Sequence, residues 1–260
     1  MKKDTCSPLA NETLFSCYSV DELQTLKTAY NRTHRNKMHG TSAKAIWMEL
    51  SKMLPCKRES CFATTLKVRT KAFAPRAPAS WKKKSSEWLS SLEFIKVFKL
   101  YEGAFPDFKF LGPSASDYDF KGEDGMCEYE DMCQLDIRTL PPHIKKLGLV
   151  FNLDEHHKDG SHWVAMYVSI SKKAVYYFDS AGEKIPTNIY KFYQQIYKQD
   201  KSYQFFQNHP VVHQLGEAEC GIYAIFFILV MMYSENFSYF TTGRWKDTTM
   251  NKLRKKLFNI

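Results

Sequence analysis

Apolar residues in the first hundred positions recur at the spacing of amphipathic helices. One set is Leu23, Leu26 and Tyr30, and Ser19 and Glu22 before it have the spacing of a capping box, which satisfies free amides at a helix start. A second set ends at Pro55 and comprises Ala43, Ile46, Trp47, Leu50 and Leu54. We predict a third helix from near Ser85, with one side formed by Phe94, Val97, Phe98 and Tyr101.

From about residue 148 the pattern changes to short apolar runs, which are typical of strands in a buried sheet. We predict strands at 149–153, 163–170, 175–178, 203–206 and 210–213. An amphipathic helix is predicted over 189–197, a buried helix over the apolar stretch 222–233, and a last helix over 247–258 that Asp247 caps. Helices first, then strands and helices around one sheet, indicate an α+β fold.

The predicted connector between these two regions is rich in proline. Residues 73–80 contain two prolines and little that could pack, so we divide the chain into a helical basic N-terminal segment (1–80) and a second domain (81–260). Residues 1–100 carry 19 Lys and Arg against 8 Asp and Glu, whereas the remainder is nearly neutral. The basic half is a candidate for contact with DNA or another acidic partner, and a solvated basic surface is the alternative.

The composition excludes several classes of protein. A content of 44% hydrophobic and 25% charged residues is ordinary for a globular domain, and the longest apolar run, Ile222 to Tyr233, is too short for a membrane span. The seven cysteines are an odd number without a visible signal peptide, so we expect reduced thiols in a cytosol-like compartment. Neither cysteine pair, 56/61 or 127/133, has the spacing of a zinc site, and we expect no metal and no cofactor.

Cys220 is the candidate nucleophile. It directly precedes the predicted buried helix, where the partial positive charge of the helix start favours a thiolate and backbone amides can receive an oxyanion. Gly221 would let the chain turn tightly without a side chain that blocks a substrate. The alternative is a buried structural cysteine ahead of a core helix.

His162, Asp179 and Gln214 could complete a catalytic site around Cys220. His162 begins one predicted strand and Asp179 ends the next, so a turn near residues 171–173 would bring them side by side, with the carboxylate orienting the imidazole. Gln214, six residues before Cys220, could donate its amide N–H to an oxyanion. Taken singly, His162 could be a surface histidine and Asp179 an ordinary turn residue.

Four motifs follow one another along the chain: Gly-Ser-His162-Trp163-Val-Ala, Tyr-Phe-Asp179-Ser-Ala-Gly, Gln214, and Glu-Cys220-Gly-Ile-Tyr. In this order they resemble the motifs of the cysteine proteases that process ubiquitin-like modifiers and of the adenovirus protease. Within that superfamily the chain is most similar to the core-protein proteases of large DNA viruses such as African swine fever virus. The resemblance implies a central mixed sheet flanked by helices, with the nucleophile at the start of a buried helix.

The resemblance also implies roles: Cys220 as nucleophile, His162 as its base, Asp179 as orienting acid and Gln214 as oxyanion donor. Trp163 would narrow the channel over small substrate residues. Some members of the viral branch have Asn in place of Asp179. The viral branch cuts after Gly-Gly or Ala-Gly in structural polyproteins during virion maturation, which implies the host cytoplasm and the virion as the site of action. The alternatives are an isopeptidase for ubiquitin-like conjugates, an acyltransferase, or a basic virion protein without enzymatic activity.

Overall fold

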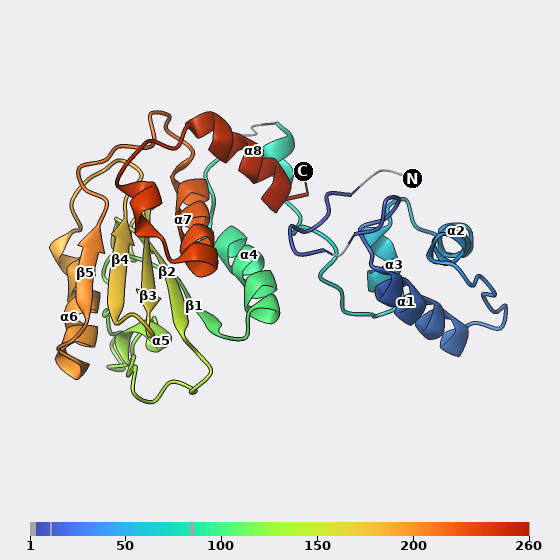
Figure 1. Ribbon diagram of the computed structural model, residues 1–260, viewed down its shortest axis with the longest axis horizontal. Coiled ribbons are helices and arrows are strands. Elements are labelled where there is room, and N and C mark those ends of the chain that lie inside the picture. Colours follow the sequence, from blue (N-terminus) through green and yellow to red (C-terminus); the bar gives the residue numbers. More distant parts are fainter. Residues whose placement is uncertain (1–3, 11, 84–85, 260) are drawn as a thin grey trace. The chain divides into compact units, whose positions relative to one another are not determined.

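The computed structural model describes residues 4–10, 12–83 and 86–259, which form two compact units (Figure 1). The N-terminal unit consists of the chain up to Lys83 together with the segment from Arg254 onward. The residues between these two segments form the sheet unit. None of the helices in the described ranges is long and apolar enough to cross a membrane.

The N-terminal unit is helical. Its elements are α1 (Val20–Thr33), α2 (Ala43–Met53), α3 (Ser60–Thr65) and the 3-10 helix η1 (Ala79–Lys82). The predicted capping box is confirmed, because the Ser19 side chain accepts from the Glu22 amide while the Glu22 carboxylate accepts from the Ser19 amide. The six residues of α3 are too few to show a helical period, and this helix was not predicted.

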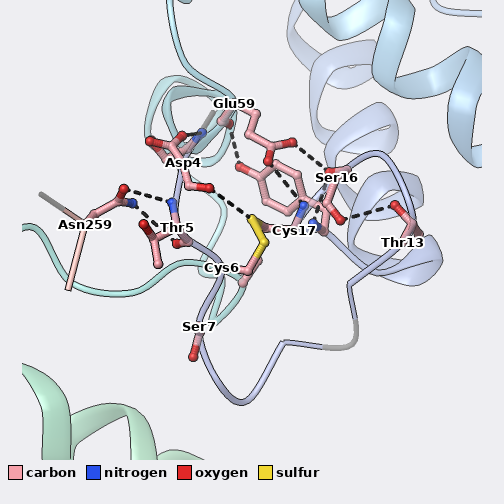
Figure 2. Close-up of a disulfide and its surroundings, with 12 residues drawn as sticks. Asp4, Thr5, Cys6, Ser7, Thr13, Ser16, Cys17, Glu59 and Asn259 are labelled. Atoms are coloured by element: carbon pink, nitrogen blue, oxygen red, sulfur yellow. Dashed lines mark hydrogen bonds between the residues drawn. A yellow bond between two sulfur atoms is a disulfide. The ribbon is translucent and has the colours of Figure 1, made fainter. Parts of the chain in front are cut away.

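The prediction of reduced cysteines is wrong for six of the seven residues. The structure pairs Cys6 with Cys17, Cys56 with Cys61 and Cys127 with Cys133, at Cα separations of 5.1, 5.7 and 6.2 Å. The turns between the partners bring each pair within the distance that a disulfide spans. Figure 2 shows the first bond beside buried Glu59, whose carboxylate accepts from the Ser16 hydroxyl at 2.8 Å and the Cys17 amide at 3.2 Å.

The sheet unit contains a five-stranded mixed sheet in the order β1-β2-β3-β4-β5. The two edge pairs, β1 with β2 and β4 with β5, are parallel, whereas β3 is antiparallel to both of its neighbours. The strands span Phe108–Ser114 (β1), Lys146–Asn152 (β2), Trp163–Ser169 (β3), Ala174–Phe178 (β4) and Gln204–Gln207 (β5). This arrangement confirms the predicted α+β class with a mixed sheet.

Helices cover both faces of the sheet (Figure 1). The helical elements from residue 86 onward are α4 (Ser91–Ala104), α5 (Glu130–Cys133), α6 (Thr187–Gln199), α7 (Cys220–Ser234), η2 (Phe237–Phe240) and α8 (Asp247–Leu257), whose residues from Arg254 onward belong to the N-terminal unit. Helix α6 buries Ile189, Phe192 and Ile196 in the cluster formed by alternate residues of β2, β3 and β4. Helix α7 packs on the other face, where the rings of Phe227 and Phe178 stack at 5.0 Å. The sheet therefore supports the middle of α7.

The structure differs from the predicted elements in three places. The expected helix start near Ser85 lies outside the described residues, and α4 begins at Ser91, where the Glu93 carboxylate accepts from the Ser90 amide at 3.0 Å. Strand β1 was not predicted, because its burial does not alternate and it contains Gly112 and Pro113. Residues 210–213 form a loop rather than a strand, since Pro210 has no amide hydrogen to donate to a sheet.

Candidate active site

The structure brings His162 and Asp179 together at one end of the sheet. His162 directly precedes β3 and Asp179 directly follows β4, and the antiparallel register of these strands places Ala165 opposite Phe178. His162 Nε2 lies 2.7 Å from Asp179 Oδ1. The carboxylate is buried with 2% of its side chain exposed, and the imidazole is 20% exposed. One ring nitrogen is thus held by a buried acid.

The environment of His162 favours its charged form. Burial alone would lower the pKa of the imidazole, but hydrogen bonds to Asp179 and Cys220, and the negative charges of both groups, raise the pKa to about 9. Because Nε2 contacts Asp179, Nδ1 is the ring nitrogen that is left to interact with Cys220. A histidine that is protonated at neutral pH between a carboxylate and a thiol is suited to stabilise a thiolate.

Asp179 is held by the loop that follows β5. The fully buried Asn208 accepts from the Asp179 amide through Oδ1 and donates to the Asp179 carbonyl through Nδ2, both at 2.8 Å. Asp179 Oδ1 also accepts from the Ala181 amide at 2.8 Å. Gly182, which ends this turn at φ +75, lies so close to the Val211 backbone that a Cβ would approach it to 2.9 Å. Backbone contacts thus fix the carboxylate before any substrate binds.

Cys220 is the first residue of α7, as the sequence predicts, and it is 1% exposed and forms no disulfide. Gly221 lies within the helix rather than in the tight turn expected for it. A Cβ at Gly221 would lie 3.0 Å from Leu89 Cβ and 3.3 Å from Phe94 Cζ. Close packing against the segment that precedes α4, and not a tight turn, therefore favours glycine at this position.

Trp163, the residue after His162, forms one wall of a groove. Its indole Nε1 donates to the Leu89 carbonyl at 2.9 Å, and its ring meets Phe94 edge-on at 4.9 Å. Trp163 lines a cavity of about 550 Å³ together with Trp88, which is 43% exposed. Trp163 thus packs against Phe94 in the core and also forms part of the wall of this cavity.

Gln214 is oriented on both sides of its amide group. Its Oε1 accepts from the Ser180 hydroxyl at 2.8 Å, and its Nε2 donates to the Gly216 carbonyl at 2.7 Å. A primary amide carries two N–H groups, so this contact uses only one of them. Within the described ranges, Gly216 provides the one acceptor recorded for Nε2, and the second N–H can donate to a substrate oxygen.

Three residues that support this site were not predicted from the sequence. Leu89 holds Trp163 and packs on Gly221, Asn208 holds Asp179, and Ser180 orients Gln214. Ser180 follows Asp179 in the quoted motif, and this adjacency was the available signal for it. Asn208 lies 29 residues from Asp179, and no spacing rule connects the two.

His156 and His157 do not form a metal site. His156 Nδ1 lies 2.6 Å from Asp117 Oδ2, and its ring stacks on Phe120 with centroids 3.7 Å apart. Among the residues that the structure describes, no group of three or more His, Cys, Asp or Glu side chains is arranged to hold a metal ion.

Residues 130–260 match the profile of the family described as "Ulp1 protease family, C-terminal catalytic domain". A putative thiol protease of Acanthamoeba polyphaga mimivirus is 32% identical over 187 residues, which cover 67% of this chain and 58% of the relative. A SUMO-1 cysteine protease of African swine fever virus is 27% identical over 137 residues, half of each chain. The chain thus spans between half and three fifths of the length of these relatives.

The fold is similar to a crystal structure of an African swine fever virus protease. The TM-score is 0.70, with 20% sequence identity, over 99% of this chain and 96% of that one. At this level of identity the likeness concerns the fold. It includes the mixed sheet and the helices that position His162, Asp179 and Cys220.

Proposed function

The chain belongs to the Ulp1 protease family, and from this premise we propose that it is a cysteine endopeptidase with Cys220 as nucleophile. The observation that carries the proposal is the 2.7 Å contact of His162 Nε2 with the buried Asp179 carboxylate, together with the free Cys220 at the start of α7, which also raises the pKa of His162. A free cysteine at a helix start next to a charged imidazole is the arrangement that nucleophilic catalysis by a thiol needs.

The reaction uses these groups in two steps. The Cys220 thiolate attacks the carbonyl carbon of the scissile bond, and the oxyanion accepts hydrogen bonds from backbone amides of the first turn of α7 and from the second N–H of Gln214. The His162 imidazolium gives its proton to the leaving amine, which departs and leaves a thioester on Cys220. Water then attacks the thioester carbonyl and loses a proton to His162, and the thiolate and a free carboxylate product are released.

The groove beside Trp163 favours small residues on the acyl side of the cut. The indole of Trp163 is fixed by Leu89, and Leu89 itself packs against Gly221 beside the nucleophile. We propose that this wall leaves little room for a β-branched or long side chain in the substrate. We therefore propose cleavage after Gly-Gly or Ala-Gly, the specificity that the family resemblance implies.

The test of this proposal is cleavage of matched peptides. Peptides of the form Gly-Gly-X, Ala-Gly-X and Val-Val-X are incubated with the full chain and with Cys220→Ala, and the products are identified by mass spectrometry. We expect cuts after the small pairs, none after Val-Val, and loss of all cleavage in Cys220→Ala with peptide binding retained. Cleavage by Cys220→Ala at the wild-type rate would refute the assignment of the nucleophile.

We further propose that the natural substrate is a structural polyprotein of a virion, and that cleavage takes place in the host cytoplasm and in the virion. The support is that the relatives named above are proteases of two large DNA viruses. Candidate virion precursors, digested with the purified chain, would give fragments whose new C-termini end in Gly. Uncut precursors beside efficiently cut peptides would refute this substrate class.

An isopeptidase for ubiquitin-like conjugates is the second candidate, because the relative from African swine fever virus is described as a SUMO-1 protease. Its chemistry at Cys220 would be the same. A SUMO vinyl-type probe and a polyprotein fragment are offered in competition. Modification of Cys220 by the SUMO probe indicates an isopeptidase, whereas occupation of the site by the polyprotein fragment indicates an endopeptidase. Transfer of the acyl group to Lys or Ser instead of water would reveal an acyltransferase.

We also propose that the N-terminal unit binds DNA through a basic groove. This unit carries 19 Lys and Arg against 6 Asp and Glu. Two cavities of about 970 and 310 Å³ share Arg58 and Arg76 in their walls, and Lys57 and Lys82 extend the basic lining. Asp4 neutralises part of this charge through its contact with Arg58 at 3.0 Å.

The salt dependence of binding tests the groove. Fluorescence anisotropy with a labelled duplex at several salt concentrations should show a steep fall in affinity, and Arg76→Ala with Lys82→Ala should reduce the logarithmic slope by about 2. Lys145→Ala with Lys198→Ala, which removes two exposed charges from the sheet unit, is the control. An unchanged slope in the groove variant would refute the site. DNA binding without thiol reactivity or proteolysis would instead favour a basic, non-enzymatic virion protein.

A further inference from the structure

The loop before α7 is braced from two sides at the residues around Gln214. We propose that Ser180 and Asp247 are positioning residues that hold the Gln214 amide where its free N–H can meet an oxyanion. The inference rests on the proposed function, since it concerns the oxyanion donor of that reaction. Neither residue is expected to touch the substrate.

Ser180 braces the loop from the side of Asp179. Its carbonyl accepts from the backbone amides of His213 and Gln214, both at 2.9 Å, and its hydroxyl donates to Gln214 Oε1 at 2.8 Å. Ser180 is 1% exposed, so water has little access to the hydroxyl and the carbonyl that form these bonds. Because Oε1 is held by Ser180 and one N–H by Gly216, the plane of the amide is determined and its remaining N–H has one direction.

Asp247 braces the loop from the start of α8. Its two carboxylate oxygens lie 3.4 and 3.2 Å from the amide of Leu215, the residue after Gln214. Tyr223 Oη donates to Asp247 Oδ1 at 2.8 Å, and Tyr223 lies one helical turn after Cys220 on α7. Asp247 therefore connects the loop that carries Gln214 with the helix that carries the thiol.

A second set of contacts keeps this brace in place. The His213 carbonyl accepts from Arg244 Nε at 2.7 Å, and Arg244 Nη2 lies 3.3 Å from Asp247 Oδ2. The Trp245 amide donates to His213 Nδ1 at 3.1 Å, and His213 Nε2 then donates to the Phe240 carbonyl at 3.0 Å. Burial lowers the pKa of His213, which agrees with a neutral ring in this role.

The test asks whether Ser180 and Asp247 act on catalysis through Gln214. Ser180→Ala and Asp247→Asn are made in the wild-type chain and in the Gln214→Ala background, and kcat and KM are measured on a Gly-Gly-X peptide. We expect kcat to fall about 3- to 10-fold for Ser180→Ala and about tenfold for Asp247→Asn, with KM little changed. In the Gln214→Ala background, both substitutions should have no further effect on kcat.

Alkylation of Cys220 by iodoacetamide is the second readout. The thiolate displaces iodide in this reaction and no oxyanion forms, so both variants should react at the wild-type rate. Ser234→Ala removes a hydroxyl with a comparable hydrogen bond at the far end of α7, about 21 Å from Cys220, and serves as the matched control. Asp21→Asn removes an acid from the first turn of α1 and controls for the helix-start charge of Asp247.

Equal losses of kcat with and without Gln214 would overturn the inference. A loss of the alkylation rate in parallel with kcat would also overturn it, because it would show that the substitutions disturb Asp179 and His162. If Ser180→Ala does not fold, Asp247→Asn still decides the question, because its carboxylate is 21% exposed. A wild-type chain without activity that depends on Cys220 would refute the proposed function instead. The two failures are thus distinguishable.

Discussion

Asp179→Asn removes the charge next to His162 and keeps the shape of the site. An asparagine Oδ1 can still accept from His162 Nε2 and from the Ala181 amide, which both lie within 2.8 Å of Asp179 Oδ1. What is lost is the carboxylate that opposes the effect of burial on the imidazole. With that charge gone, we expect the His162 pKa to fall from about 9 toward or below the ordinary value of 6.5.

The size of the effect follows from the pKa of His162. The difference between 6.5 and about 9 corresponds to about 3 kcal/mol of stabilisation of the imidazolium in the folded chain. Because the pKa is higher in the folded chain than in the unfolded chain, this stabilisation is fully present below pH 6.5 and is lost as the pH rises through 9. At pH 7.5 the variant should therefore have a mostly neutral imidazole and a kcat lower on the order of 100-fold.

Two measurements check this prediction. NMR titration of the His162 ring should give an imidazolium that persists to about pH 9 in the wild-type chain but not in Asp179→Asn. Urea unfolding at several pH values should show a decline of the free energy of unfolding between pH 6.5 and 9 that the variant largely lacks. Asp117→Asn, which neutralises the other Asp–His pair of the sheet unit, is the matched control. An unchanged His162 titration in Asp179→Asn would refute the reasoning.

Three further predictions concern the supports of the site and of the N-terminal unit. Gly221→Ala should lower the free energy of unfolding by about 1–3 kcal/mol in urea denaturation, because the new Cβ meets Leu89 and Phe94; unchanged stability would mean that Leu89 is free to move. Asn208→Ala should cost about 2 kcal/mol in the same assay and lower kcat, since it leaves the amide of Asp179 without its hydrogen-bond acceptor; a loss of stability alone, with kcat intact, would contradict its link to catalysis. Reduction with a phosphine should lower the midpoint of thermal unfolding and release the Cys6–Cys17 loop, which contributes about 2–3 kcal/mol; an unchanged midpoint would contradict a stabilising bond.

Local patterns were sufficient to predict most elements of the fold. The capping box at Ser19 and the apolar runs of β3 and β4 lie where the structure has them, because each depends on neighbours in the sequence. Strand β1 was not predicted, since its buried residues do not alternate with exposed ones and its pairing with β2 shifts register between Phe110 and Pro113. The disulfides escaped it as well, because the odd number of cysteines pointed to reduced thiols and their pairing depends on turns that the spacing does not reveal.

The residues of the candidate site also fall into those that local patterns predict and those that they do not. The meeting of His162 and Asp179 followed from two strands joined by a short turn, and the place of Cys220 followed from the apolar helix after it. The contacts of Asn208, Ser180 and Asp247 depend on the path of the loop before α7, which carries no periodic signal. Gly221 was predicted in a tight turn, but it lies within α7, where a Cβ would approach Leu89 to 3.0 Å.

Covalent trapping is the most direct test of whether the thiol, the imidazole and the carboxylate work as one unit. A peptide that ends in Gly-Gly with an α,β-unsaturated methyl ester in place of the scissile amide, to which the thiolate adds without a leaving group, is added to the full chain, to His162→Ala and to Asp179→Asn, and the adduct is mapped by peptide mass spectrometry. We predict a single adduct on the sulfur of Cys220 in the wild-type chain, slower labelling in Asp179→Asn and almost none in His162→Ala. Labelling of Cys220 at equal rates in all three proteins, or an adduct on another residue, would contradict the account.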